Sequence, residues 1–182
     1  MGNIIGFSGK IGSGKTTLAK FVHEQLPEYE IKHFATALKQ ASAIITGLPE
    51  DWFWNQDMKN QQFTFAGEIT TVGAFLQWFG TDVMRKFDNS VWVKALFNQL
   101  GDSSNWIIDD VRFINEANAV SSSGLLIRLE GDPAGIRANS GRNLTHQSEI
   151  ELDDWVFHET LITNQPIEKT KQQLIKILNA YL

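Results

Sequence analysis

The chain has 182 residues, of which 42% are hydrophobic, and a formal net charge of −5, so it suits one domain that can bury a core of its own. It contains no cysteine, which excludes a disulfide framework and a thiolate metal site. Lys and Arg form no block and no apolar run approaches the roughly 20 residues of a membrane span, so we expect a cytoplasmic protein without a signal peptide, a nucleic-acid-binding surface or a membrane anchor.

A phosphate-binding loop lies between the first two expected elements. Residues 3–8 predict a buried strand, and the apolar spacing of residues 16–26 predicts a helix with one buried face. Between them Gly9–Thr16 reads Gly-Lys-Ile-Gly-Ser-Gly-Lys-Thr, a complete G-x-x-x-x-G-K-[ST] motif. The order of strand, glycine turn and helix is the context that this motif requires, so it predicts that the chain binds a nucleoside triphosphate.

The chemistry of this loop assigns its residues. The turn presents backbone N–H groups, and the helix N-terminus adds partial positive charge, so the two together attract an anion. Lys15 is expected to reach the outer phosphates, and the hydroxyl of Thr16 is expected to bind magnesium. The expected nucleotide ligands of the loop are Gly12, Ser13, Gly14, Lys15, Thr16 and Thr17.

An insertion follows the second expected strand. Residues 30–34 predict that strand and residues 36–46 a helix. Residues 47–100 then hold helical patterns, over 68–86 and 91–100, but no convincing strand. Because this is about ten times a usual connection between elements, we expect an insertion that holds the acceptor of a phosphoryl group.

Several insertion residues are candidates for binding that acceptor. Arg85 could clamp an acceptor phosphate, Gln77 could contact a base, and Lys39, on the preceding helix, could face the site or merely decorate the surface. The many aromatic residues of the insertion are expected to form its own core, with one or two free to stack on a nucleobase. The sequence does not say which of them would do so.

Two carboxylates stand at the end of the next expected strand. Residues 106–110 predict this strand, and Asp109 and Asp110 end it. A carboxylate at the end of a buried strand is what a P-loop enzyme needs to hold its metal. Arg112 follows two residues later and could grip an acceptor phosphate with two hydrogen bonds, or pair with Glu116 on the surface.

The C-terminal third continues the alternation of helices and strands. A helix is expected over 113–120, strands over 125–129 and 160–163, and a last helix from about Pro166 to Tyr181. The polar stretch 131–147 is expected to be a mobile lid, with Arg137 and Arg142 as candidates for closing onto the triphosphate. His146 could touch phosphate, and Ser148 with Glu151 could form a capping box that starts a short helix.

Together these elements predict a three-layer α/β fold of the P-loop NTPase type with a five-stranded parallel sheet. We expect one domain with a core of residues 1–46, 101–130 and 148–182, a helical acceptor-binding insertion of residues 47–100, and a lid of residues 131–147. This is the layout of a small phosphotransferase.

Five segments also carry a family resemblance. They are the P-loop, Phe-Ala-Thr-Ala-Leu-Lys at 34–39, Phe-Leu-Gln-Trp-Phe-Gly-Thr-Asp at 75–82 with Arg85 and Trp92, Asp-Val-Arg-Phe at 110–113 with Asn-Glu-Ala at 115–117, and His-Gln-Ser-Glu at 146–149. In these segments the chain resembles the phage-type deoxynucleoside monophosphate kinases, and the resemblance extends over nearly its full length.

The resemblance implies an NMP-kinase-like fold with a helical NMP-binding insertion, and transfer of the γ-phosphoryl group of ATP to a dNMP with Mg²⁺. It implies that Arg85 and Arg112 bind substrate phosphate, and it favours Asp110 over Asp109 as the acid that holds the metal with Thr16. The expected catalytic residues are therefore Lys15, Asp110 and Arg112. The expected substrate-binding residues are Lys39, Gln77, Arg85, Trp92 and Arg112.

Two alternatives stay open. Dephospho-CoA kinases have a similar P-loop and a similar Ile162-Thr163-Asn164 before the last helix, but they place an aspartate just past the second strand, where this chain has His33-Phe34-Ala35-Thr36. A P-loop ATPase switch would need no small-molecule acceptor. The sequence also leaves open a homodimer and the identity of the accepted bases.

Overall fold

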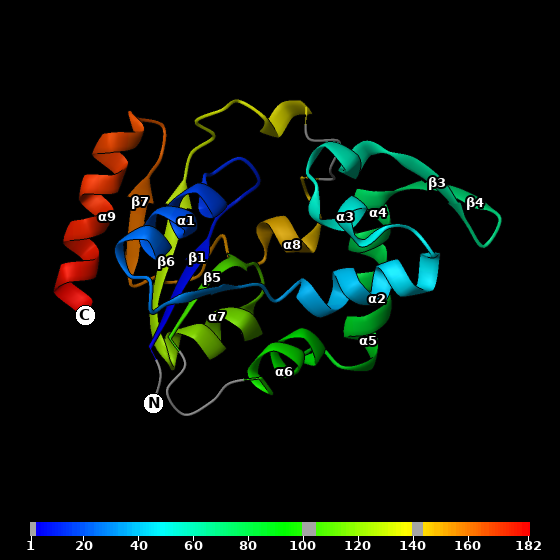
Figure 1. The fold of residues 1–182 in the computed structure, drawn as a ribbon, viewed down its shortest axis with the longest axis horizontal. Coiled ribbons are helices and arrows are strands. Elements are labelled where there is room, and N and C mark those ends of the chain that lie inside the picture. The colour runs from blue at the N-terminus through cyan, green and yellow to red at the C-terminus, as the bar shows by residue number, and fades with distance from the viewer. Residues whose placement is uncertain (1–2, 100–104, 140–143) are drawn as a thin grey trace. The chain divides into compact units, whose positions relative to one another are not determined.

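The computed structural model describes residues 3–99, 105–139 and 144–182 (Figure 1). They form two compact units. The first unit contains Met1–His33, Leu100–Ser140 and Thr145–Leu182, and the second contains Phe34–Gln99 and a short piece that ends at Leu144. The boundary falls directly after His33, so the helix expected over 36–46 belongs to the second unit and not to the core that surrounds the P-loop.

A five-stranded parallel sheet organises the first unit. Its strands are β1 (Ile4–Ser8), β2 (Glu30–Lys32), β5 (Trp106–Val111), β6 (Gly124–Glu130) and β7 (Glu159–Ile162). Their order across the sheet is β2-β5-β1-β6-β7, and every neighbouring pair is parallel. The predicted α/β fold with a five-stranded parallel sheet is confirmed, and its central strand is the one that leads into the P-loop.

Helices cover both faces of this sheet. On one face α1 (Lys15–Gln25) and α9 (Ile167–Tyr181) bury an apolar core against the odd-numbered residues of the central strands, among them Ile5 and Ile107. On the other face lies α7 (Ile114–Ser121), which packs so closely that a Cβ added to Gly6 would lie 2.5 Å from Val120. Figure 1 shows α9 running beside the edge strand β7. The result is a three-layer arrangement.

The segment after β6 contains a short 3₁₀ helix (Arg137–Asn139) and α8 (Gln147–Ile150). The capping box expected from Ser148 and Glu151 does not start α8. The helix begins one residue before Ser148, and the ring Nδ1 of His146 accepts the backbone N–H of Ser148 at 3.2 Å. Glu151 instead accepts from the backbone N–H of Ile114 at 2.9 Å. His146 therefore has a structural role at this helix start.

The second unit is mainly helical. It contains α2 (Thr36–Thr46), α3 (Glu50–Trp54), a 3₁₀ helix (Asp57–Asn60), α4 (Val72–Gln77), a π-helical segment (Trp78–Met84), α5 (Arg85–Phe87) and α6 (Val91–Phe97). Its buried centre is Phe53, Val72 and Phe75, against which other aromatic side chains of the insertion pack, as expected. Phe87, by contrast, is 85% exposed.

A β-hairpin corrects the expectation that this region has no strand. β3 (Gln62–Phe65) and β4 (Glu68–Thr71) pair antiparallel around Ala66 and Gly67, both of which have positive φ values, 51° and 88°. This is the left-handed pair that a two-residue hairpin turn requires. Because alanine rarely adopts it, the turn was hidden in the sequence. The helix expected from Glu68 consequently starts only at Val72, where the Thr71 hydroxyl accepts the N–H of Ala74.

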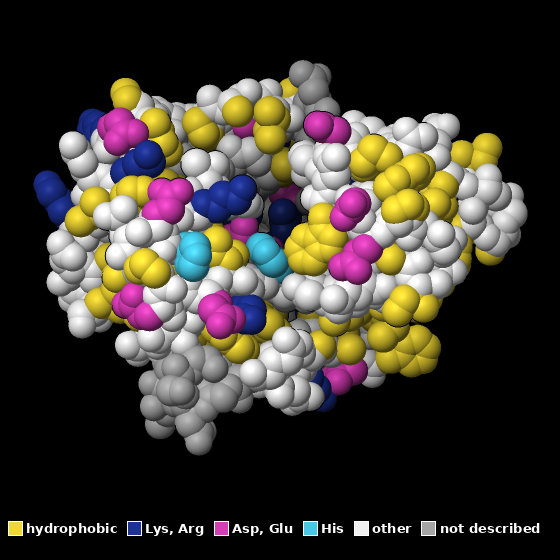
Figure 2. Space-filling model, in the orientation of Figure 1, with side chains coloured by type: hydrophobic (Ala, Val, Ile, Leu, Met, Phe, Trp, Pro, Cys, Tyr) yellow, Lys and Arg dark blue, Asp and Glu magenta, His cyan; other side chains and the backbone are white. Residues whose placement is uncertain are grey.

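Charged side chains of both signs lie on the surface. On the face shown in Figure 2, Lys and Arg side chains are interspersed with Asp and Glu. Within the described residues, no helix is both long and apolar enough to cross a bilayer.

Candidate functional site

The P-loop connects the C-terminus of β1 to the N-terminus of α1. Gly14, directly before the helix, has a φ of 88°, a left-handed conformation that glycine adopts without strain. Gly12 also has a positive φ, and a Cβ there would lie 2.2 Å from a carboxylate oxygen of Asp132. Both positions therefore favour glycine, and they let the backbone turn its N–H groups toward an anion.

Lys15 is buried within the turn of this loop. Its ammonium donates hydrogen bonds to the carbonyl oxygens of Gly9 at 2.6 Å and Lys10 at 2.8 Å, and to the hydroxyl of Ser13 at 3.3 Å. The positive charge is therefore held inside the loop and solvated by backbone carbonyls. A phosphate bound there would find the cation already in place.

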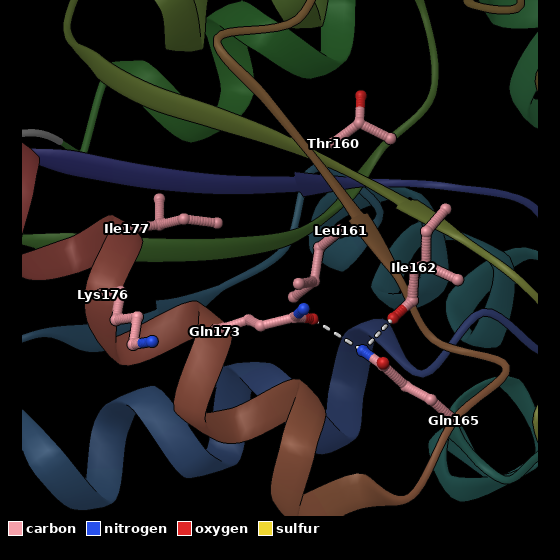
Figure 3. A pocket seen from close by; sticks show the side chains of 7 residues that line it. All are labelled: Thr160, Leu161, Ile162, Gln165, Gln173, Lys176 and Ile177. Atoms are coloured by element: carbon pink, nitrogen blue, oxygen red, sulfur yellow. Dashed lines mark hydrogen bonds between the residues drawn. The ribbon is translucent and has the colours of Figure 1, made fainter.

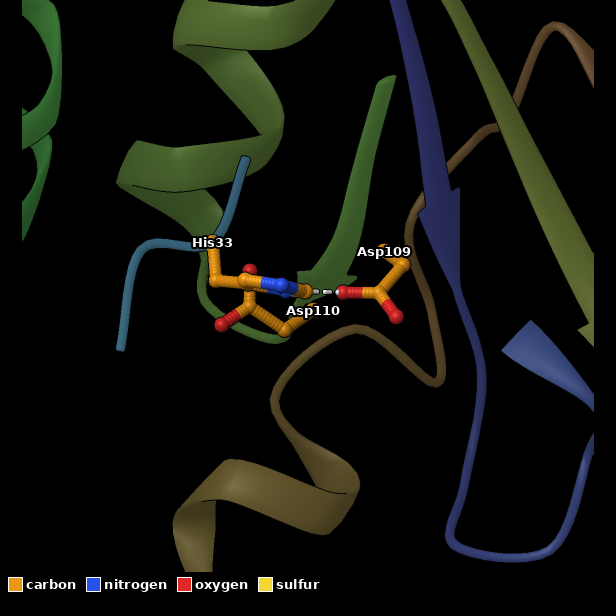
Figure 4. Close-up of side chains that lie close together, drawn as sticks. All are labelled: His33, Asp109 and Asp110. Carbon is orange, nitrogen blue, oxygen red and sulfur yellow. Dashed lines mark hydrogen bonds and ion pairs between the residues drawn. The ribbon is translucent and has the colours of Figure 1, made fainter. Parts of the chain in front are cut away.

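The hydroxyl of Thr16, the next residue, meets a carboxylate from β5. Thr16 Oγ1 donates to Asp109 Oδ2 at 2.7 Å, and His33 Nδ1 lies 2.5 Å from Asp109 Oδ1. His33 follows β2, so the contact joins the carboxyl ends of two neighbouring parallel strands, where ligands of such sheets bind. Figure 4 shows the His33 ring and the Asp109 carboxylate directed at each other.

Burial in the sheet disfavours the charge of Asp109, yet its pKa lies below the ordinary value of 3.8. Hydrogen bonds from His33 and Thr16 and the positive charges of His33 and Lys15 outweigh the desolvation. The carboxylate is therefore ionised at neutral pH. Ligand atoms of His33, Asp109 and Asp110 all lie within 4.8 Å of one another. Together with the Thr16 hydroxyl, the two carboxylates are the hard oxygen donors that Mg²⁺ prefers, so the residues fit this ion.

The lowered pKa of Asp109 predicts how stability depends on pH. The stabilisation is complete above the unfolded-state pKa, near 4, and is lost as the pH falls through that value toward the lower folded-state pKa. Asp109→Asn lacks this contribution at every pH. We therefore expect the gap in unfolding free energy between wild type and variant to be larger at pH 5 than at pH 3, as measured by urea denaturation. An unchanged gap would show that the native contacts do not favour the ionised carboxyl.

The structure places Asp109, and not Asp110, against Thr16. Side chains alternate along a strand, and Ile107 faces α1, so Asp109 faces α1 as well. Asp110 is half-buried on the neighbouring position and belongs to the same cluster. The resemblance favoured Asp110 for the partnership with Thr16, and the alternation of β5 explains why its neighbour makes that contact.

Two predicted arginines lie in this unit. Arg112 forms an ion pair with Glu149 and donates to the carbonyl oxygen of Ser148 at 3.2 Å. Arg137 donates to the carbonyl oxygen of Ile11, inside the P-loop, at 3.2 Å, and to that of Gly131 at 2.5 Å. Arg137 is thus attached to the P-loop backbone. Arg142 lies outside the described residues.

The predicted acceptor residues other than Arg112 lie in the second unit. Arg85 is buried and donates to the carbonyl oxygen of Asn89 at 2.7 Å, and the indole N–H of Trp92 donates to that of Gly80 at 3.0 Å. The Lys39 ammonium lies 3.6 Å from the centre of the Trp54 ring. The side-chain nitrogen of Gln77 is buried and has no hydrogen-bond partner among the residues that the structure describes.

A separate groove lies between β7 and α9, with a volume of about 510 Å³. It is lined by Thr160, Leu161, Ile162, Gln165, Gln173, Lys176 and Ile177 (Figure 3). The amide of Gln165 bridges Ile162 and Gln173 with bonds of 2.7 and 2.6 Å. None of the predicted site residues lines this groove, so we assign it no part in the chemistry of the P-loop.

Sequence reasoning missed two residues of the site, His33 and Glu149. His33 had no ligand spacing to any other histidine, and its only signal was its position at the end of the second strand. Glu149 belongs to the His-Gln-Ser-Glu segment that carries the family resemblance, but no chemistry was assigned to it. Both contact residues far away in sequence, 76 positions in one case and 138 in the other.

No protein-family model and no curated protein matches the chain. Among solved structures it is similar to shikimate kinase from Acinetobacter baumannii in complex with shikimate, with 16% identity, coverage of 100% of this chain and 96% of that chain, and a TM-score of 0.56. It is also similar to shikimate kinase from Bacteroides thetaiotaomicron, with 14% identity, coverage of 97% of this chain and 98% of that chain, and a TM-score of 0.54. For shikimate kinase from Aquifex aeolicus the identity is 12%, the coverage is 97% of this chain and 96% of that chain, and the TM-score is 0.51. The chain therefore has the P-loop fold that these kinases share.

Proposed function

We propose that the chain is an ATP-dependent kinase that transfers the γ-phosphoryl group of ATP to a deoxynucleoside monophosphate, giving ADP and a dNDP. The observation that carries the proposal is the P-loop with Lys15 inside its turn and Thr16 bonded to Asp109. This arrangement supplies a cation for the phosphates and oxygen ligands for Mg²⁺. The similarity of the fold to shikimate kinases supports phosphoryl transfer to a small molecule.

In the proposed reaction an oxygen of the acceptor phosphate attacks the γ-phosphorus, a new P–O bond forms, and the bond to the β-phosphate oxygen breaks as ADP leaves. The attacking oxygen is already ionised at neutral pH, so no side chain needs to remove a proton. Bound Mg²⁺, held by Thr16 and an acid of β5, would neutralise phosphate charge. Lys15 would bind the transferring group, Arg112 the acceptor phosphate, and Arg137 would brace the loop.

For the acceptor, the second unit offers a donor that lacks a partner. A buried amide N–H that makes no hydrogen bond is costly, and native structures seldom keep one without a reason. The Gln77 nitrogen is in this position among the described residues, directly before the π-helical segment, and π-helical turns often mark functional sites. A nucleobase carbonyl or ring nitrogen would satisfy it. Arg85 directly follows this segment and would bind the nucleotide phosphate.

A kinase with an alcohol acceptor, such as dephospho-CoA, is the second candidate. A hydroxyl must lose its proton during transfer, and an imidazole oriented by a carboxylate is a common general base. His33 and Asp109 form such a pair. This observation is the reason to keep alcohols among the acceptors tested.

The decisive experiment is continuous measurement of ADP release from Mg-ATP with dAMP, dCMP, dGMP, dTMP, their ribose forms, dephospho-CoA and shikimate offered one at a time. Fast turnover with one or more dNMPs is the expected result. Turnover confined to an alcohol would replace the proposal with the second candidate. Slow ADP release that is the same with every acceptor would mean that the chain is an ATPase switch.

Arg85→Lys tests the acceptor site. Lysine keeps the charge but cannot form the two parallel hydrogen bonds of a guanidinium, so we expect the KM for the dNMP to rise about 10- to 100-fold. The affinity for ATP should stay unchanged, as judged by calorimetry. Lys86→Ala, a change at the exposed neighbouring cation, is the control and should alter neither value. Loss of ATP binding with normal dNMP affinity would show that Arg85 serves the donor.

A further inference from the structure

Glu149 is a buried carboxylate that contacts two parts of the candidate site at once. Its side chain is 1% exposed. One oxygen, Oε2, accepts the backbone N–H of Ile11 in the middle of the P-loop at 3.1 Å. The other, Oε1, forms the ion pair with Nη1 of Arg112. A single carboxylate group therefore contacts both the P-loop backbone and the Arg112 guanidinium.

The ion pair leaves one edge of Arg112 available. Within the described part of the chain, the guanidinium bonds through Nη1 alone, to Glu149 and to the Ser148 carbonyl. The Nε–H and the Nη2 group lie on the other edge of the fork and have no protein partner there. This pair of parallel donors is the set that binds a phosphate bidentately. The Arg112 side chain is 20% exposed, so an anion can reach it.

The backbone on both sides of the contact is fixed. Arg112 donates its own N–H to Glu116 at 2.8 Å, which anchors it at the start of α7. The N–H of Glu149 donates to the His146 carbonyl at 2.8 Å within the first turn of α8. The carbonyl oxygen of Ile11 accepts a hydrogen bond from Arg137, so both backbone polar groups of Ile11 have partners. Every group around the carboxylate thus has a defined position.

Attraction of substrate cannot be the purpose of this carboxylate. A negative charge beside a site for ATP and a phosphate acceptor repels both ligands, and burial makes the charge costly to desolvate. Stability alone does not explain it either, because a buried ion pair can often be replaced by apolar side chains without loss of stability. The carboxylate instead orients two groups, since one oxygen orients the loop and the other orients the guanidinium.

We infer that Glu149 is a positioning residue that fixes Arg112 and the P-loop relative to each other, so that the Nε–Nη2 edge of Arg112 meets an oxyanion next to the loop. The inference gives a purpose to the His-Gln-Ser-Glu segment, in which His146 caps α8, the Ser148 carbonyl accepts from Arg112 and Glu149 bridges. It rests on the proposed function only for the identity of the oxyanion as the acceptor phosphate. The contact with the P-loop stands without it.

The test combines a double-mutant cycle with a binding measurement. Glu149→Ala should lower kcat/KM for the acceptor about 100-fold, through kcat more than through KM, because the arginine remains but is misdirected. In an Arg112→Ala background, the loss of kcat/KM caused by Glu149→Ala should be about 10-fold smaller than in the wild type, because the two residues act as a unit. Glu149→Ala should also weaken Mg-ADP about 10-fold in calorimetry, because the Ile11 peptide loses its anchor.

Glu151 provides the matched control. It lies two residues away and also accepts a backbone N–H, but its hydrogen bonds go to Ile114 and Gln147, and not to the P-loop or Arg112. Glu151→Ala should leave kcat/KM and Mg-ADP affinity close to wild type. Glu149→Gln keeps the volume and one acceptor oxygen, so it should be intermediate, and it replaces Glu149→Ala in the test if the alanine variant fails to fold.

The outcomes separate the inference from the proposed function. Independent, multiplicative effects of Glu149→Ala and Arg112→Ala would overturn the inference, as would Glu149 variants that match the Glu151 control. If wild type turns over none of the acceptors, the proposed function fails. The Mg-ADP measurement then still decides: weakening confined to the Glu149 variants supports the bridge, and equal affinity in all variants refutes it.

Discussion

Replacement of Lys15 by alanine is expected to lower turnover with Mg-ATP by about 10³-fold or more, because phosphoryl transfer depends on positive charge at the transferring group. The effect should lie in kcat, measured by coupled ADP release with the acceptor saturating. The Lys15 ammonium also donates hydrogen bonds to the carbonyl oxygens of Gly9 and Lys10, so the variant loses loop contacts as well as charge.

Lys10→Ala is the control for this experiment. Lys10 lies in the same loop, but its ammonium pairs with Asp153 at 2.8 Å and is partly exposed. An exposed pair of this kind contributes little, so turnover should stay within about 2- to 3-fold of wild type. A far-ultraviolet circular dichroism spectrum of each variant establishes that the fold is intact. A folded Lys15→Ala enzyme with nearly normal turnover would remove the P-loop from the mechanism.

The second large effect is expected from Asp109→Asn. The amide keeps the shape of the carboxylate but not its charge, so we expect kcat to fall about 10²- to 10³-fold and the Mg²⁺ concentration for half-maximal activity to rise. Asp110→Asn should cost about 10-fold, because Asp110 shares the cluster but does not hold the Thr16 hydroxyl. Titration of both variants with Mg²⁺ and Mn²⁺ measures the difference. A larger loss in Asp110→Asn would return the leading role to that residue, as the family resemblance implies.

Local signals predicted much of the first unit. The residues of the P-loop are contiguous, so the glycines, the lysine and the threonine within eight positions indicate its geometry. The buried strands also stand out, because a strand covered on both faces is an unbroken apolar run. From these two signals follow the parallel sheet and the place of Asp109 and Asp110 at its carboxyl edge.

What could not be predicted depends on geometry that is not written locally. The hairpin of β3 and β4 turns on Ala66, a residue without turn preference, in a conformation that only the folded hairpin enforces. The π-helical segment Trp78–Met84 has the same apolar pattern as the α-helix that we expected there. The partnerships of His33 with Asp109 and of Glu149 with Ile11 join residues that the sheet brings together from distant parts of the chain.

The strand order has a consequence for how the protein folds during its synthesis on the ribosome. β1 is synthesised first, yet its two neighbours in the sheet are β5 and β6, so Ile4 waits for Trp106 and Gly124 before it can pair. The nascent chain thus carries an apolar strand with two open edges until β5 and β6 have been synthesised. Such long-range pairing slows folding and exposes the strand to aggregation. We therefore expect protease resistance of arrested nascent chains to appear only after β6 has left the exit tunnel.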